Sequence, residues 1–310
     1  MRLTKHFIVF ALFAASLGAA QTGAELATAG RLAEAAQALE QELSAREQLQ
    51  PADPLAVAHA LNDLAVVYRV QDRTEDAARL YLRALEILRD PAQNGARSGG
   101  PNPLLAVVLH NLGRLRTEQG HRKEGERLLR EAIQRWEECW GPDHPDVAAG
   151  LTSLGVVLQS RGRLEEAGRL LDRASQIDRR SFPSDDLRIA LDLNNTASLE
   201  AARKRYPDAE RLLRQSVELL EKRGFADDPA MGRTLGNLGE VLLSEKKLGD
   251  AQQAFQRATE ILTRAWGPGD RRLVEWMERY AVVLRKREDF VGAERVEMQV
   301  MRIRVANTLR

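Results

Sequence analysis

The sequence predicts an all-α protein, built as a right-handed superhelical solenoid of antiparallel helix pairs. Three observations support this fold class. One spacing of 42 residues recurs along the chain, each repeat carries two apolar stripes with helical spacing, and charged residues form 29% of the composition while aromatic residues form only 5%. Because a single helix pair cannot bury its apolar face alone, neighbouring pairs must stack. We expect about six full repeats and an N-terminal half-repeat.

Two landmarks define the repeat. A leucine (methionine in the last unit) and a small residue each recur every 42 residues, and both series contain one step of 48. Two landmarks that share one period and one insertion are poorly explained by chance. The leucine series is Leu61, Leu109, Leu151, Leu193, Leu235 and Met277, and the small series is Ala35, Ala77, Gly125, Ala167, Ala209, Ala251 and Ala293.

This period sets the expected organisation of the chain. Residues 1–20 form a leader and residues 21–310 form the solenoid. The six extra residues of the long step fall in segment 90–101, which is rich in glycine, proline and small polar residues and therefore predicts a loop. The solenoid comprises a half-unit at 21–50 and units at 53–101, 102–143, 144–185, 186–227, 228–269 and 270–310.

The leader has the composition of a secretory signal peptide. Arg2 and Lys5 precede an apolar run at 7–17, and small residues at 18–20 precede Gln21. The run is too short to span a bilayer, which needs about 20 apolar residues. We expect cleavage after Ala20, a periplasmic or secreted protein, and no stable membrane insertion afterwards. An uncleaved membrane anchor is the alternative.

Each unit contains a first and a second helix joined by a tight turn. In the unit at 144–185, Leu151, Leu154 and Leu158 form one apolar stripe, and a second stripe follows from Leu164 after a short break. The turn position that ends the first helix favours a left-handed backbone, which glycine adopts without cost. Gly120 and Gly162 satisfy it, whereas four non-glycine residues there should each cost about 1 kcal/mol. Those four are Asp72, Lys204, Lys246 and Glu288.

The starts of the first helices also recur. An Asp, Asn or His, often followed by proline, stands where it can cap the first turn of each helix, and proline is pre-organised for the first helical position. An aromatic residue before several of these starts is expected to fill the gap between units. The cap pairs are Asn102-Pro103, His144-Pro145, Asp186-Leu187, Asp228-Pro229 and Asp270-Arg271, and the aromatic residues are Trp140, Phe182 and Trp266.

These residues resemble the tetratricopeptide repeat. Leu64-Ala65-x-x-Tyr68 is followed by Ala77-x-x-x-Tyr81 and Ala84, and Leu238-Gly239-x-x-Leu242 is followed by Ala251-x-x-x-Phe255 and Ala258. The usual unit has about 34 residues. The longer period, with the segment 140–148 between units, is similar to the kinesin-light-chain type. The resemblance implies a scaffold with a groove that binds peptides or proteins, although the fold alone does not define a function.

Composition and motifs exclude other classes of function. Net charge is +1, and removal of the leader leaves 44 basic and 45 acidic residues, so nucleic acid is not an expected partner. The single cysteine, Cys139, cannot form an internal disulfide and is expected to be packed. The histidines show no metal-binding spacing, and no phosphate loop or nucleophile motif occurs. We therefore expect no enzyme, no catalytic residues, no metal and no cofactor.

One stripe of each first helix should line a concave binding surface. In the second unit it comprises Val107, Asn111, Arg114 and Glu118, and the positions equivalent to Asn111 are Asp63, Ser153, Asn195, Asn237 and Arg279. Asparagine is unfavourable inside a helix, so its recurrence there needs a reason. In the family that the chain resembles, such asparagines line the peptide-binding groove, which implies this role for Asn111, Asn195 and Asn237. The alternative is that these amides bond neighbouring helices together.

The stripe also predicts a charge preference near its C-terminal end. Arg233, Arg279 and Lys286 lie on it, partly balanced by Glu240 and Glu275, so a ligand with acidic character is expected there.

The closing helix is unusually apolar. Val296, Met298, Val300, Met301, Ile303 and Val305 pack inward, or else they form a face that meets a second copy or another protein.

The sequence as a whole predicts an exported, non-enzymatic interaction scaffold that binds a peptide or protein segment. The alternative is a small-ligand or peptide sensor, or an accessory subunit of an extracytoplasmic complex.

Overall fold

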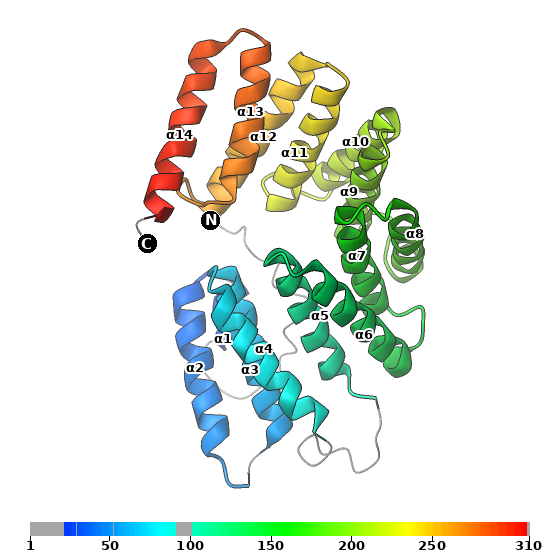
Figure 1. The fold of residues 1–310 in the computed structure, drawn as a ribbon, viewed down its shortest axis with the longest axis vertical. Coiled ribbons are helices and arrows are strands. Elements are labelled where there is room, and N and C mark those ends of the chain that lie inside the picture. Colours follow the sequence, from blue (N-terminus) through cyan, green and yellow to red (C-terminus); the bar gives the residue numbers. More distant parts are fainter. Residues whose placement is uncertain (1–21, 29, 52, 91–100, 309–310) are drawn as a thin grey trace. The chain divides into compact units, whose positions relative to one another are not determined.

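The computed structural model describes residues 22–28, 30–51, 53–90 and 101–308, and all regular structure in these ranges is α-helical (Figure 1). The predicted leader and most of the predicted loop at 90–101 lie outside the described residues. The helices are α1 (Gly23–Thr28), α2 (Leu32–Gln48), α3 (Pro54–Val70), α4 (Thr74–Arg89), α5 (Pro103–Glu118), α6 (Arg122–Trp140), α7 (Pro145–Ser160), α8 (Leu164–Ser181), α9 (Leu187–Ala202), α10 (Tyr206–Lys222), α11 (Pro229–Ser244), α12 (Leu248–Trp266), α13 (Leu273–Lys286) and α14 (Phe290–Thr308).

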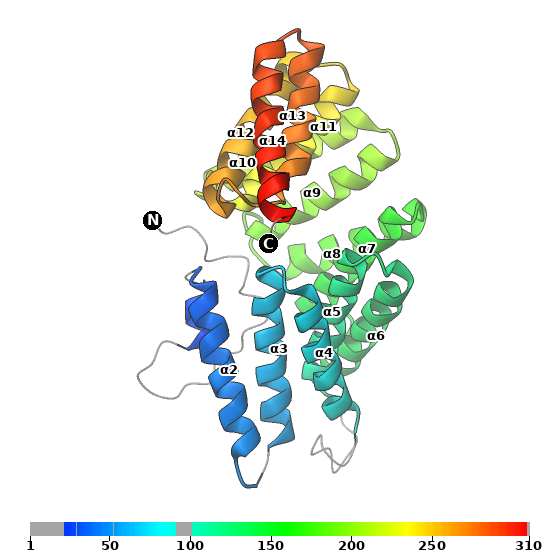
Figure 2. The same cartoon turned by 60° about the vertical axis from the view of Figure 1, so that its left-hand side comes forward.

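The helices pack in chain order within two compact parts, which meet in sequence at Gly162 and Arg163. Odd-numbered helices are the first helices of the repeats and even-numbered helices are the second. In each part, second helices pack against the first helix of the following repeat, as α6 does on α7 and α12 on α13. Consecutive first helices also touch, as α9 and α11 do, and Figure 2 shows α13 and α14 side by side. This packing confirms the predicted class of an all-α solenoid.

Most of the predicted helix caps are present. The side chains of Asn102, His144, Asp186 and Asp228 each accept a hydrogen bond from the backbone N–H two residues later, at 2.8–3.2 Å. The last repeat differs, because α13 begins at Leu273 and not at the predicted Arg271. There Asp270 accepts from the backbone N–H of Arg272 at 2.9 Å, which closes a turn before the helix begins.

The turn position after each first helix has the left-handed backbone that the sequence predicted. Its φ is 78° at Gly30, 87° at Gly120 and 75° at Gly162. The four non-glycine residues adopt the same conformation: Asp72 at 67°, Lys204 at 64°, Lys246 at 63° and Glu288 at 65°. The geometry of the turn is therefore fixed by the hairpin, whether or not glycine is present.

A recurring polar contact joins neighbouring repeats. The residue that ends a first helix reaches back to the second helix of the preceding repeat, where its side chain meets a backbone carbonyl or a polar side chain. The pairs are Gln71 with Leu32, Gln119 with Glu75, Arg161 with Glu126, Arg203 with Leu164 and Arg287 with Gln252. Because these contacts recur at the repeat spacing, they help to fix the position of each repeat on the previous one.

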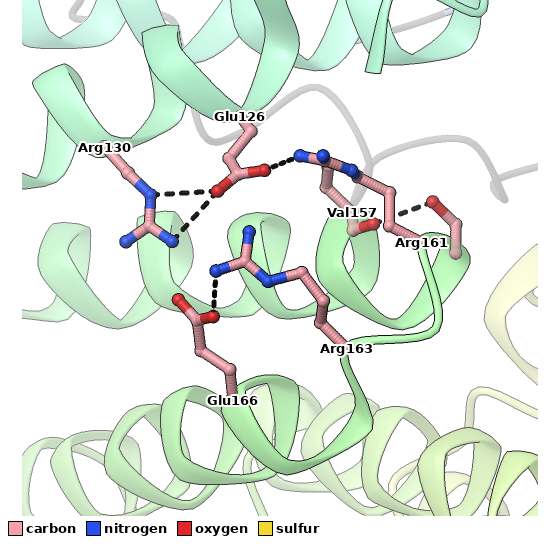
Figure 3. Close-up of polar contacts among 7 residues, drawn as sticks. Glu126, Arg130, Val157, Arg161, Arg163 and Glu166 are labelled. Carbon is pink, nitrogen blue, oxygen red and sulfur yellow. Dashed lines mark hydrogen bonds and ion pairs between the residues drawn. The ribbon is translucent and has the colours of Figure 1, made fainter. Parts of the chain in front are cut away.

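Figure 3 shows the arginine version of this contact. Glu126 of α6, whose exposed fraction is 8%, pairs with Arg161 at the end of α7 and accepts hydrogen bonds from Arg130 at 3.0 and 3.1 Å. The two arginines neutralise a buried carboxylate that would otherwise be costly.

The aromatic residues between repeats are only partly buried, so they fill the gap less completely than the sequence suggested. Trp140 is 51% exposed, and its ring stacks on His144 at 5.5 Å between centroids. The guanidinium of Arg188 lies 3.7 Å from the centroid of the Phe182 ring, and Arg272 covers Trp266 at 4.3 Å. Each ring is thus a platform for a polar or charged residue at the start of the next first helix.

One junction between repeats contains two carboxyl groups where the others are mainly apolar. Asp178 of α8 and Asp192 of α9 are both buried, with exposed fractions of 7% and 8%. At the equivalent positions of α4, α6, α10 and α12 stand Leu88, Trp136, Leu220 and Leu262, and at those of α5, α7, α11 and α13 stand Val108, Gly150, Thr234 and Trp276. The α8–α9 contact therefore lacks the apolar pairing of its neighbours.

Candidate functional site

The predicted stripe of the first helices is accessible but not uniformly exposed. Asn111, Ser153, Asn195, Asn237 and Arg233 are partly buried. Arg114, Arg279 and Lys286 are exposed. The amides and the hydroxyl are therefore less accessible than the long cations, and Asn111, Ser153 and Asn237 contact neighbouring first helices.

In the N-terminal part, Asn111 braces one first helix against the preceding one. Its Nδ2 donates to Oδ1 of Asn62 on α3 at 3.0 Å, and Asn62 in turn donates to Oδ1 of Asp63 at 3.1 Å. Asn62 is 1% exposed, and burial raises the pKa of Asp63 to about 7. This chain of hydrogen bonds satisfies a buried amide between α3 and α5.

Ser153 makes the equivalent contact one repeat later. Its Oγ lies 2.9 Å from Nε2 of His110 on α5, and the His110 ring lies 5.2 Å from the Trp136 ring between centroids. Burial lowers the pKa of His110 to about 3, so the imidazole is neutral at physiological pH and acts as a hydrogen-bonding strut.

The C-terminal part repeats the arrangement with two asparagines. Nδ2 of Asn237 on α11 donates to Oδ1 of Asn194 on α9 at 2.9 Å. The structure thus assigns Asn111, Ser153 and Asn237 a bracing role, which was the alternative reading of this position. Their contact with a ligand stays a prediction, as does that of Asn195.

The sequence alone did not identify the hydrogen-bond partners of these stripe residues on the preceding first helix. The partners Asn62, His110 and Asn194 stand one residue before the stripe position and are themselves spaced at the repeat period, allowing for the insertion. A search for paired polar positions would have found them. Which side chain of the neighbouring helix meets the stripe residue depends on how far that helix is rotated about its axis. The apolar periodicity of the sequence defines this rotation only approximately.

The cations near the C-terminal end of the stripe are not all available to a ligand. Nε of Arg279 lies 3.1 Å from Oε1 of Glu240, so these two charges pair across α11 and α13. Burial lowers the pKa of Arg233, which is consistent with its partly covered position. Lys286 is exposed at the end of α13. The local excess of positive charge is therefore smaller than the sequence suggested.

Each of the two parts exposes one apolar side chain at the same position of a first helix. Val156 of α7 is 47% exposed and Val282 of α13 is 40% exposed. Both occupy the stripe position that holds Arg114 in α5 and Glu240 in α11. Within each part, an exposed valine beside polar groups of the same helix suits a peptide, which offers both apolar side chains and polar backbone groups.

The C-terminal part also contains a shallow pocket on this stripe. It has a volume of about 90 Å³ and lies among α9, α10 and α11. Its lining residues are Ala197, Ser198, Ala201, Leu213, Asn237, Glu240 and Val241. The pocket therefore includes Asn237, one of the residues that the sequence placed on the binding stripe.

No other kind of site emerges from the described ranges. Within them, no three His, Cys, Asp or Glu side chains gather closely enough to hold a metal ion. None of the helices described is both long and apolar enough to cross a membrane. Cys139 is partly buried, and burial raises the pKa of its thiol.

Comparison with known proteins identifies the family. One tetratricopeptide repeat model matches residues 57–90, and another matches residues 104–180 and 146–222. No curated protein sequence matches the chain.

The solved structures with a similar fold include other repeat proteins. A Podosopora anserina putative kinesin light chain with nearly identical TPR-like repeats shares 20% identity and a TM-score of 0.52, covering 69% of this chain and 98% of that one. BtubC (BKLC) from P. vanneervenii shares 22% identity and a TM-score of 0.56, covering 76% and 92%. The apo form of RapI shares 13% identity and a TM-score of 0.68, covering 93% and 97%. The motifs, the family models and the fold agree that this chain is a tetratricopeptide repeat protein, and its fold is similar to that of solved kinesin-light-chain-like repeats.

Proposed function

We propose that the protein is a non-enzymatic scaffold that binds an extended peptide or protein segment along the stripe of its first helices. The observation that carries this proposal is the mixed character of the stripe within each part: exposed Val156 follows Ser153 by three residues on α7, and exposed Val282 lies between Arg279 and Lys286 on α13. Braced first helices hold these groups in fixed positions, which lowers the ordering cost of binding. Tetratricopeptide folds are used as scaffolds for such contacts.

The test compares two variants of matched chemistry. Val156→Asp places a charge on the proposed binding face, and Leu82→Asp does the same on second helix α4, where Leu82 is 40% exposed. Full-length protein is used to capture partners from an extracytoplasmic extract. We expect a stoichiometric protein partner that Val156→Asp loses and Leu82→Asp retains. Capture that is equally insensitive to both variants contradicts the proposed face.

The alternative function is a small-ligand or peptide sensor, or an accessory subunit of an extracytoplasmic enzyme or envelope complex. The pocket among α9, α10 and α11 is the observation that favours it. Thermal stabilisation by a metabolite panel, with no protein partner captured, would support this alternative over the scaffold.

We also propose that the protein is exported. The basic residues, apolar run and small residues at 2–20 support cleavage after Ala20. Fractionation followed by N-terminal sequencing should give mature protein in the periplasm or medium that begins at Gln21. A membrane-bound protein that retains Met1 would favour the uncleaved anchor instead.

We propose further that the bound segment carries acidic residues where it lies near α13. Lys286 supplies exposed positive charge there, while Arg279 shares its charge with Glu240. Replacement of Arg279 and Lys286 by alanine should weaken binding of the captured partner and flatten its salt dependence. No change in either quantity would remove this part of the proposal.

Self-association through α14 is a further part of the proposal. Val296, Val300 and Ile303 are buried, whereas Met298, Met301 and Val305 are 55%, 67% and 54% exposed. The closing helix thus packs inward on one side and presents an apolar face on the other. At the positions of Met298 and Val305, α4 carries Leu82 and Arg89, and the second helices α6, α8, α10 and α12 carry only polar or charged residues: Arg130, Asp172, Arg214, Gln256, Glu137, Arg179, Glu221 and Thr263.

A further inference from the structure

The pocket in the C-terminal part exists because one repeat carries an unusually small residue. Ala201 of α9 is the smallest side chain at its position, and the five equivalent residues are Arg69, Thr117, Gln159, Leu243 and Arg285. Leu213 of α10 is not unusual, because Leu129 and Leu171 occupy its position in two other repeats, although Tyr81 and Phe255 occupy it in two more. The small side chain of Ala201 therefore distinguishes the pocket's lining from the equivalent positions of the other repeats.

The pocket combines apolar walls with hydrogen-bond acceptors. Ala197, Ala201, Leu213 and Val241 supply the apolar lining, and Glu240 supplies a carboxylate. Oε1 of Glu240 is buried and accepts no hydrogen bond of good geometry from any residue that the structure describes, although the Arg279 ion pair lies beside it. A carboxylate has more acceptor sites than one arginine pair uses, so a ligand hydroxyl or amide that donates to Glu240 gains free energy there.

Size and charge restrict what the pocket can accept. A volume of about 90 Å³ suits a short side chain rather than an aromatic one. An anionic side chain would be repelled by the Glu240 carboxylate, and a cationic one would compete with Arg279, whose Nε lies 3.1 Å from Oε1 of Glu240. A small uncharged group with a hydrogen-bond donor is neither repelled by the Glu240 carboxylate nor in competition with Arg279.

We propose that this pocket receives one short, uncharged side chain of the bound segment, with a hydroxyl or amide that donates to Glu240, as serine, threonine or asparagine would. The proposal rests on the proposed function, because it assumes a peptide along the first helices. It assigns the Ala201 pocket as a specificity-determining subsite of that groove.

The experiment fills the pocket. A phage library of random 12-residue peptides is selected in parallel on the full-length protein and on its Ala201→Leu variant. Leucine is the residue at the equivalent position of the next repeat, Leu243, so the fold should accept it. Ala201→Ser is the matched control that keeps the pocket open, and Ala201→Val replaces the leucine variant if its thermal midpoint falls.

Peptides selected on the wild type should share Ser, Thr or Asn at one position. Affinity of a synthetic consensus peptide should fall at least about tenfold in Ala201→Leu and stay unchanged in Ala201→Ser. A consensus peptide with alanine at the shared position should lose a similar, about tenfold, affinity for the wild type. The same alanine should change affinity for Ala201→Leu almost not at all.

The two proposals fail in different ways. The pocket assignment is overturned if the selected peptides bind Ala201→Leu as tightly as they bind the wild type. It is also overturned if the peptides share a charged or aromatic residue at the position whose effect depends on Ala201. Both results leave the peptide-binding function standing. If neither protein selects any peptide, both proposals are overturned.

Discussion

The buried carboxyl groups of Asp178 and Asp192 oppose stability when they are ionised. Burial raises the pKa of Asp178 to about 6 and that of Asp192 to about 7. Arg188 lowers and Asp186 raises the first pKa, whereas Asp178 raises and Arg179 lowers the second. One oxygen of each aspartate, Oδ1 of Asp178 and Oδ2 of Asp192, accepts no hydrogen bond from the described residues. The junction is therefore most stable when these carboxyl groups are protonated.

This pair should make stability fall as pH rises. The folded pKa values lie above the ordinary aspartate value, so between about pH 4 and pH 7 the folded state holds protons that the unfolded state has released. The contribution is complete below pH 4 and is lost as pH passes through the folded pKa values.

Asp192→Asn should remove most of that slope. At pH 8 the variant should be more stable than the wild type by at least about 1 kcal/mol, because it no longer buries an ionised carboxylate. At pH 4 the two should be nearly equal. Urea unfolding from pH 4 to pH 8 measures this, with Asp172→Asn, an exposed aspartate of α8, as the control. Equal slopes for wild type and Asp192→Asn would refute the expectation.

At the scale of the element, the turn between the two helices of a repeat imposes a left-handed residue. Lys246 adopts φ 63° there, and Gly162 adopts 75° at the equivalent position. A Cβ added at Gly162 meets nothing within 4 Å, so any cost there comes from the backbone conformation.

Lys246→Gly should therefore stabilise the protein by up to about 1 kcal/mol, and Gly162→Ala should destabilise it by a similar amount. Thermal or urea unfolding of both variants measures the pair. A loss of stability in Lys246→Gly would show that the lysine side chain contributes more than the strain it causes.

The side-chain hydrogen bonds between consecutive first helices also act at the scale of the element. A double-mutant cycle of Asn194→Ala and Asn237→Ala should give a coupling free energy of about 1 kcal/mol, because each single change leaves a half-buried amide unpaired. The exposed bond between Gln256 and Glu260, 3.1 Å long, provides a control cycle that should give almost no coupling. Additive effects in the Asn194–Asn237 cycle would mean that this hydrogen bond adds nothing to stability.

At the scale of the whole molecule, we expect the closing helix to determine whether copies associate. A solenoid normally ends in a polar outer face, and the apolar face of α14 departs from this rule. We expect a dimer in sedimentation experiments at micromolar concentration and a monomer after Met301→Glu. Leu82→Glu, another exposed apolar position, should leave the dimer intact. A wild type that sediments as a monomer at all concentrations contradicts self-association.

The sequence by itself determined the class of fold, the length of the repeat, most helix starts and the left-handed turns. These features depend on local periodicity, on capping side chains and on backbone sterics, all of which act within one repeat. It also located the stripe of first-helix residues, because every repeat must present the same face.

Tertiary structure alone decided which neighbouring residues the stripe contacts. Asn62 and Asn194 became partners of Asn111 and Asn237, and Glu240 neutralised Arg279, because each depends on how far neighbouring helices are rotated and shifted. The Ala201 pocket and the later start of α13 likewise depend on how neighbouring helices are placed. Periodicity defines the face of a helix to within about one residue, whereas a hydrogen bond requires atoms to meet within a few tenths of an ångström.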